Sequence, residues 1–165
     1  MHLRRRDAVV EIRNCSCGSS LALQIDALEE TADGPAADGE LRPDAPLETI
    51  VVVERDVHVR RLLLHFIGSA HLVEFLDDGY AALDRVRKAP PAALVAEIMT
   101  ARLDGLALCR LLKGDSSTAK VPVLLFSVLA ATDRARHAGA DAFVTKPLEK
   151  QLFVSSLLRV LEKHE

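Results

Sequence analysis

The 165-residue sequence has no tryptophan, one tyrosine and only 4% aromatic residues. Surfaces that bind single-stranded nucleic acid rely on aromatic stacking, so this scarcity argues against such a surface. An excess of Lys and Arg is also missing, because the formal net charge is -3. Since affinity for nucleic acid comes mainly from clustered basic residues, we expect no nucleic acid partner.

Long apolar runs are absent as well. No run approaches the roughly 18 residues that a membrane-spanning helix needs, and the basic start is followed by Asp7 instead of a signal-type apolar stretch. Three cysteines make a poor disulfide framework and suit a reducing compartment. We therefore expect a cytoplasmic protein without membrane contact, and the 49% apolar content is enough to build a core.

The first third of the chain differs from the rest. Residues 26–48 form an acidic segment that prolines and glycines interrupt, which predicts an extended linker. Before it, residues 8–13 and 21–25 are short strand-like runs, so residues 1–25 are predicted to be a β-hairpin arm. Because an isolated hairpin is marginally stable, we expect it to fray, to dock on the main domain or to pair with a second copy.

From residue 49 to residue 165, strand and helix periodicities alternate along the chain. The predicted strands are residues 49–53, 72–75, 93–98, 121–126 and 142–145, and a helical pattern follows each of them. Five strands alternating with five helices predict an α/β fold, a doubly wound parallel sheet with helices on both faces. In such folds the functional site lies at the carboxyl ends of the strands.

Polar residues stand at the ends of four of these strands. They are Glu54, Arg55 and Asp56 after the first strand, Glu97 at the end of the third, Ser127 after the fourth and Lys146 after the fifth. Together with Asp104-Gly105 and Lys146-Pro147, this order resembles the receiver domain of bacterial two-component response regulators, over about two thirds of the chain. The resemblance implies a flavodoxin-like fold with strand order 2-1-3-4-5, and a signalling protein that is not an enzyme.

The resemblance also implies a role for each strand-end residue. Glu97 stands at the phosphoacceptor position, Glu54, Arg55 and Asp56 at the acidic pocket, Ser127 and Phe143 at the switch positions, and Lys146 at the pocket lysine. In that family an Asp accepts the phosphoryl group from a sensor kinase, and acids after the first strand help to hold Mg²⁺.

Two of these positions depart from the family pattern. Arg55 replaces an acid, so two carboxylates and two cations give a formal sum of zero where the family has about -2, and guanidinium cannot ligate a metal. Glu97 is one methylene too long for a positioned transfer reaction. We therefore expect a pseudo-receiver without a metal in its pocket. Glu97 either mimics the phosphorylated state, reaching toward Ser127 and Lys146, or only closes an ion pair with Arg55 or Lys146.

The spacing near the carboxyl end departs too. Only 18 residues separate Ser127 from Lys146, short by nearly one helical turn. A short fourth helix would remodel the surface through which receivers usually signal. Phe143 is either the switch aromatic without the tyrosine hydroxyl or a plain core residue.

The cysteines allow one further site. Cys15 and Cys17 offer half of a zinc site that a second chain would complete, or they belong to a tight turn at Gly18. Cys109 is expected in the core.

The sequence thus predicts a phosphorylation-independent signalling protein that binds a protein partner, either a sensor kinase or a downstream signalling protein, with a homodimer possible. The first alternative is a phosphorylatable receiver with Mg²⁺ in a phosphorelay, and the second is a dimeric scaffold clasped by Zn²⁺.

Overall fold

A computed structural model describes residues 9–14, 20–25 and 47–162 of the chain, with side chains from residue 47 onward. Seven strands form one sheet in the order β1-β2-β4-β3-β5-β6-β7. Their bounds are β1 (Val9–Asn14), β2 (Ser20–Ile25), β3 (Thr49–Val53), β4 (Leu72–Leu76), β5 (Ala93–Glu97), β6 (Val123–Ser127) and β7 (Ala142–Thr145). The last five are parallel, which confirms the predicted doubly wound sheet of order 2-1-3-4-5.

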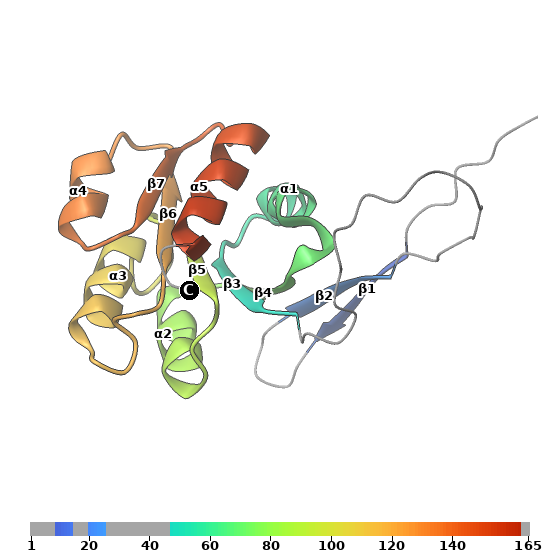
Figure 1. The fold of residues 1–165 in the computed structure, drawn as a ribbon, viewed down its shortest axis with the longest axis horizontal. Helices are drawn as coiled ribbons and strands as arrows, with labels where there is room; N and C mark the ends of the chain where they lie inside the picture. Colours follow the sequence, from blue (N-terminus) through green and yellow to red (C-terminus); the bar gives the residue numbers. More distant parts are fainter. Residues whose placement is uncertain (1–8, 15–19, 26–46, 163–165) are drawn as a thin grey trace, which may run out of the picture.

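Helices cover both faces of this parallel sheet (Figure 1). They are α1 (Val57–Ile67), α2 (Gly79–Lys88), α3 (Gly105–Gly114), α4 (Thr132–His137) and α5 (Lys150–Glu162), and a short 3₁₀ turn, η1 (Gly68–Ala70), follows α1. Buried residues of α1 and α5 pack in one core cluster, and those of α2, α3 and α4 pack in the other.

Strand β3 explains why the sheet is buried on both sides. Its β-branched residues alternate between the two cores, with Val51 and Val53 in one cluster and Ile50 and Val52 in the other, all four at 0% exposure. A strand that is apolar on both faces is typical of a parallel sheet between two layers of helices. The carboxyl end of β3 is thereby held within the core.

The start of α3 is fixed against the end of β5. A Cβ atom at Gly105 would lie 2.5 Å from the carbonyl oxygen of Glu97, so this close approach of two backbones requires glycine. Asp104 caps the helix, and its Oδ1 accepts a hydrogen bond of 2.8 Å from the Ala107 N–H. The backbone around Glu97 is therefore positioned by both β5 and α3.

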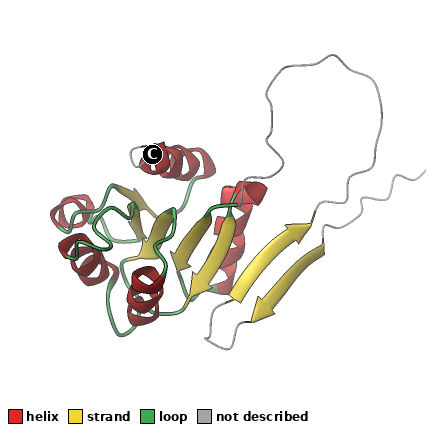
Figure 2. Ribbon diagram, turned by 60° about the horizontal axis from the view of Figure 1, so that its bottom comes forward, coloured by secondary structure: helices red, strands yellow, loops and turns green. Residues whose placement is uncertain are grey.

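The amino-terminal hairpin joins the same sheet. Strands β1 and β2 pair antiparallel over six residues each, and β2 pairs antiparallel with β4 from Ser20↔Phe75 to Ala22↔Val73 (Figure 2). The sequence left three outcomes open for the hairpin, and in the structure it docks on the main domain. The linker prediction for residues 26–48 falls almost entirely outside the described residues, and the division into parts 1–25, 26–48 and 49–165 stays a prediction.

Within the described part of the chain, no helix is long and apolar enough to cross a membrane.

Candidate functional site

Two carboxylates meet at the carboxyl edge of the sheet. Glu54 directly follows β3 and Glu97 ends β5, and these strands pair side by side with Val53 opposite Ala96. Both acids are almost fully buried, at 5% and 7% exposure. Because an unpaired buried charge is costly, each carboxylate needs a partner.

Lys146, which directly follows β7, supplies that partner. Its Nζ lies 2.7 Å from Oε2 of Glu97 and 3.2 Å from Oε2 of Glu54. The same Nζ stands 5.1 Å from the ring centroid of Phe126. We call Glu54, Glu97 and Lys146 the acid–lysine cluster; one ammonium bridges both carboxylates.

Backbone groups bind the remaining carboxylate oxygens. Oε1 of Glu54 accepts a hydrogen bond of 2.9 Å from the Asp56 N–H, and Oε1 of Glu97 accepts one of 3.1 Å from the Met99 N–H. The Lys146 N–H donates to the Ser127 carbonyl oxygen at 2.8 Å, which ties β7 to the end of β6. Every carboxylate oxygen of the cluster thus has a donor within the protein.

The ammonium of Lys146 is stabilised in its charged form. Burial alone would lower the pKa of Lys146, but the hydrogen bond to Glu97 and the negative charges of Glu54 and Glu97 outweigh it and raise the pKa above its ordinary value. The ion pairs therefore persist at neutral pH.

Ser127 lies at the same edge but does not join the cluster. It is fully buried, and among the described residues its Oγ has no hydrogen-bond partner. Glu97 pairs with Lys146, which is one of the two ion pairs that the sequence left open. In the described part of the chain, no hydrogen bond joins Glu97 to Ser127. Phe143 is half-buried and packs against the core under α2, α3 and α4, so its core role is supported and its switch role stays a prediction.

Asp56 has a structural role in the described fold. It is the N-cap of α1, and its Oδ1 accepts hydrogen bonds from the N–H groups of Val59 and His58, at 3.2 and 2.7 Å. These two bonds lower the pKa of Asp56. Its carboxylate is therefore directed to the start of α1.

Arg55 lies apart from the two buried acids. It is exposed and lines a shallow hollow of about 440 Å³ at the same edge of the sheet, together with Asp77, Asp78, Ala101 and Arg102. No ion pair joins Arg55 to Glu54 or Glu97 within the residues that the structure describes. The neutralising cation of the cluster is Lys146, and the idea that Arg55 stands in the metal's place stays a prediction.

Sequence reasoning missed a second basic contact. The Arg60 side chain on α1 donates through Nε to the Glu54 carbonyl oxygen, and its Nη2 lies 2.6 Å from Oδ1 of Asp77. It thereby holds the backbone of Glu54 from the helix that follows. The sequence feature that could have indicated this contact was the position of Arg60, one helical turn after the capping residue Asp56.

The donor set does not fit Mg²⁺. A magnesium ion takes carboxylate oxygens from one or two acids and keeps several waters. Here Lys146 binds both buried carboxylates, Asp56 caps α1, and Arg55 offers only donors. Among the described residues, no three His, Cys, Asp or Glu side chains gather as metal ligands do.

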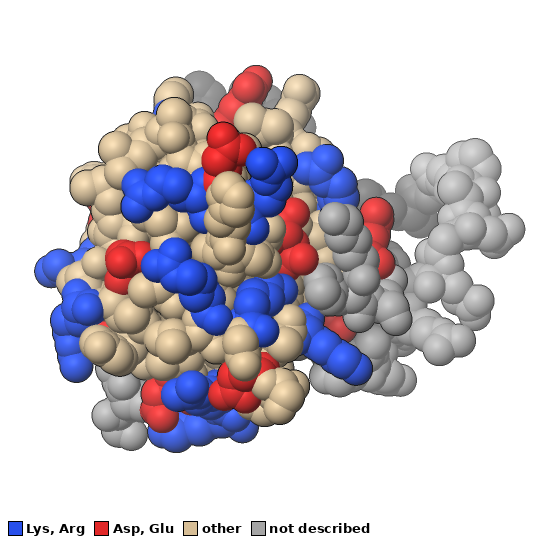
Figure 3. Space-filling view, turned by 90° about the vertical axis from the view of Figure 1, so that its left-hand side faces the viewer, with Lys and Arg blue, Asp and Glu red and all other residues tan. Residues whose placement is uncertain are grey.

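Helix α4 is short, as the spacing between Ser127 and Lys146 predicts. Helix α4 has six residues, with Ala135 buried. The loop before it exposes Val128 and Leu129 at 62% and 43%. On the face formed by α3 and α4, Lys and Arg side chains are spread among Asp and Glu (Figure 3). This face is mixed in charge.

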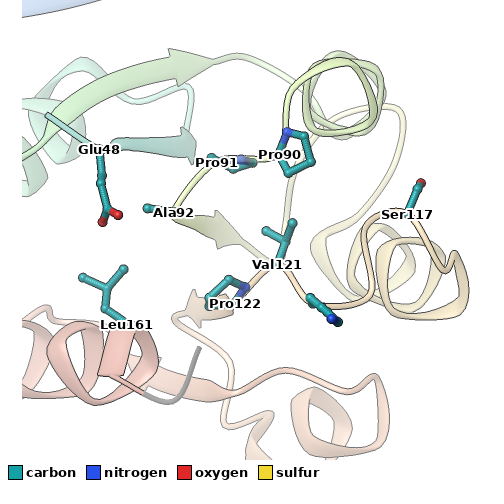
Figure 4. A pocket seen from close by; sticks show the side chains of 9 residues that line it. Glu48, Pro90, Pro91, Ala92, Ser117, Val121, Pro122 and Leu161 are labelled. Atoms are coloured by element: carbon teal, nitrogen blue, oxygen red, sulfur yellow. The ribbon is translucent and has the colours of Figure 1, made fainter. Parts of the chain in front are cut away.

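A second pocket lies at the opposite end of the sheet. It has a volume of about 270 Å³ and is lined before β5 by Pro90, Pro91 and Ala92 and before β6 by Val121 and Pro122 (Figure 4). Glu48 and Leu161 face it from the other side. Ser117 and Lys120 also line it, but among the described residues neither side chain is paired with a base or an acid of the pocket, so we assign no chemistry to it.

The cysteine predictions have separate outcomes. Cys15 and Cys17 lie outside the described residues, and the zinc hypothesis stays a prediction. Cys109 is fully buried in the core, as expected, and burial raises the pKa of its thiol to about 11.

Comparisons with known proteins agree with this architecture. The family described as response regulator receiver domain matches residues 50–158. The response regulator MprA of Mycobacterium tuberculosis is 34% identical over 121 residues, which are 69% of this chain and 50% of the relative. The chain thus spans about half the length of the curated relatives that it matches.

Two solved structures are also similar. The signal receiver domain of a signal transduction histidine kinase from Syntrophus aciditrophicus is 28% identical, with a TM-score of 0.65 over 70% of this chain and 91% of that one. The chemotaxis response regulator CheY4 of Vibrio cholerae shares the fold at 18% identity, with a TM-score of 0.64 over 70% of this chain and 99% of that one.

Proposed function

We propose that this chain, which belongs to the response regulator receiver domain family, signals without accepting a phosphoryl group and acts through contact with a protein partner. Receiver domains are signalling modules of two-component systems. The observation that carries the proposal is the bridge from Lys146 to both buried carboxylates, at 2.7 and 3.2 Å.

This bridge opposes phosphoryl transfer for a chemical reason. Transfer requires a metal and a cation to neutralise charge on the moving oxygens, and it requires an acceptor placed in line. In this pocket the one ammonium is shared between the acceptor position Glu97 and Glu54, and Arg55 removes one metal ligand. A metal entering here would have to displace an ammonium from two buried oxygens.

The longer side chain of Glu97 adds a second obstacle. Its Oε2 is held by Lys146 and its Oε1 by the Met99 N–H, and these contacts lower the nucleophilicity of both oxygens. The unpartnered hydroxyl of Ser127 favours the ion-pair interpretation of Glu97 over the phosphate mimic, because a mimic would use that hydroxyl. Phosphorylation then does not change the charge of the pocket, and signalling depends on whether the partner is present.

The partner that we propose is a protein, either a sensor kinase or a downstream signalling protein. The exposed apolar side chains at the rim of the pocket support this, since Met99, Val128 and Leu129 are 63%, 62% and 43% exposed. They follow β5 and β6 within two residues, so they lie at the same edge of the sheet as the acid–lysine cluster. Exposed apolar groups that are rimmed by charges are typical of protein contacts.

The test is incubation of the full chain with acetyl phosphate and Mg²⁺, followed by intact-mass measurement. We expect no mass gain, because both carboxylates stay bound to Lys146. The matched comparison is the variant Arg55→Asp/Glu97→Asp under the same conditions, which should gain one phosphoryl group. A gain of one phosphoryl group by the unmodified chain would support a phosphorylatable receiver and refute the proposal.

A further inference from the structure

The hairpin leaves one edge of the seven-stranded sheet open among the described strands. β1 is the outermost strand, and its six residues pair with β2 alone (Figure 2). The outer edge of such a strand presents N–H and C=O groups that can pair with another strand. We propose that this edge binds the same edge of a second copy, so that two chains join through antiparallel β1 strands. This inference goes beyond the proposed function and does not rest on it.

The sequence of β1 is complementary to itself in one register. If the two-fold axis passes through Ile12, position 11 of each copy stands opposite position 13 of the other. These positions are Glu11 and Arg13, so the dimer contains two pairs of opposite charge. Directly opposed pairs of opposite charge stabilise antiparallel strands, whereas like charges destabilise them.

The neighbouring registers lose this complementarity. An axis through position 11 puts Glu11 opposite its own copy, and an axis through position 13 does the same for Arg13. An axis between residues is excluded, because opposed residues share a face of the sheet and adjacent residues do not. The charge pattern therefore selects the register centred on Ile12, which also pairs Val10 with Asn14.

Joining the β1 edges does not cover the acid–lysine cluster. In the sheet order, β2 and β4 separate β1 from β3, and the cluster residues come from β3, β5 and β7. Each copy would keep its own cluster and the apolar rim around it. The dimer would therefore present two partner-binding sites on one continuous sheet.

The experiment measures the molar mass of the full chain by light scattering after size exclusion. We expect twice the 18.0 kDa of one chain. The single changes Glu11→Arg and Arg13→Glu each place like charges opposite one another twice, and we expect each to weaken dimerisation about tenfold or more. The double change Glu11→Arg/Arg13→Glu restores opposite pairs and should restore the dimer.

The control is Arg61→Glu on the exposed side of α1, which should leave the mass unchanged. A far-ultraviolet circular dichroism spectrum of each variant establishes that its fold is kept. A monomeric unmodified chain would overturn the inference. Single variants that dimerise as before, or a folded double variant that stays monomeric, would also overturn it.

Discussion

Replacing Lys146 by methionine should lower the free energy of unfolding by about 3 kcal/mol. Among the described side chains, Lys146 is the cation that pairs with the carboxylates of Glu54 and Glu97, so the change leaves two buried carboxylates without that counter-charge. Breaking a buried ion pair on one side costs about 3–5 kcal/mol, and the partial exposure of Lys146, at 19% of its side chain, places the expected loss at the lower end. Urea denaturation at pH 7 measures it.

The matched control is Lys150→Met at the exposed start of α5, which should change stability by less than about 0.5 kcal/mol. Adding Glu54→Gln and Glu97→Gln to the Lys146→Met variant should recover part of the loss, because no buried charge then remains. A loss as small as that of Lys150→Met would mean that the bridge does not hold the cluster together.

The same variant should remove an alkaline transition. The pKa of Lys146 is raised in the folded state, so its contribution to stability is fully present below the unfolded pKa of about 10.5. That contribution is lost as the pH rises through the folded pKa. We therefore expect the stability difference between the unmodified chain and Lys146→Met to shrink above about pH 10.5.

The double variant Arg55→Asp/Glu97→Asp should acquire the phosphorylation that we expect the unmodified chain to lack. The change gives three carboxylates and one ammonium at the strand-end positions 54, 55, 97 and 146, which restores the formal charge of about -2 that favours a divalent cation. It also shortens the acceptor side chain by one methylene, and a displacement of about 1 Å can change the rate of a positioned reaction about 100-fold. Intact-mass measurement with acetyl phosphate and Mg²⁺ should show a gain of one phosphoryl group.

The single variants separate the two causes. Glu97→Asp keeps the guanidinium of Arg55 and should gain little phosphate, whereas Arg55→Asp restores the ligand but keeps the long acceptor. Chelating Mg²⁺ should abolish the gain in the double variant. If the double variant stays unmodified while its fold is intact, the two substitutions are not what prevents phosphorylation.

Much of the site was predictable because strand ends are local in sequence. Apolar runs located the strands, and the fold rule for parallel sheets places the residues that follow them at one edge, which predicted Glu54, Glu97, Ser127 and Lys146 together. The short α4 followed from counting residues. These features depend on sequence position and on the direction of the strands.

Other features depend on side-chain geometry that spacing does not encode. Sequence reasoning left open whether Arg55 or Lys146 would pair with Glu97, because both positions lie at the same edge. The structure distinguishes them, since Lys146 reaches both acids and Arg55 is exposed. The contact of Arg60 with the Glu54 backbone was missed for the same reason.

The docking of the hairpin was also undecided from the sequence. Three outcomes were open, because pairing between β2 and β4 joins residues about fifty positions apart, such as Ala22 and Val73. Short strands with few charges can pair in several places. The order β1-β2-β4 fixes which edge of the sheet the hairpin extends.

Lys146, and not a metal, is the counter-charge that we assign to the two buried carboxylates. Calorimetric titration of the full chain with Mg²⁺ at pH 7, alongside the Arg55→Asp/Glu97→Asp variant, tests this assignment most directly. We expect no saturable binding to the unmodified chain at millimolar Mg²⁺ and clear binding to the variant. Saturable binding to the unmodified chain that Glu97→Gln removes would contradict it.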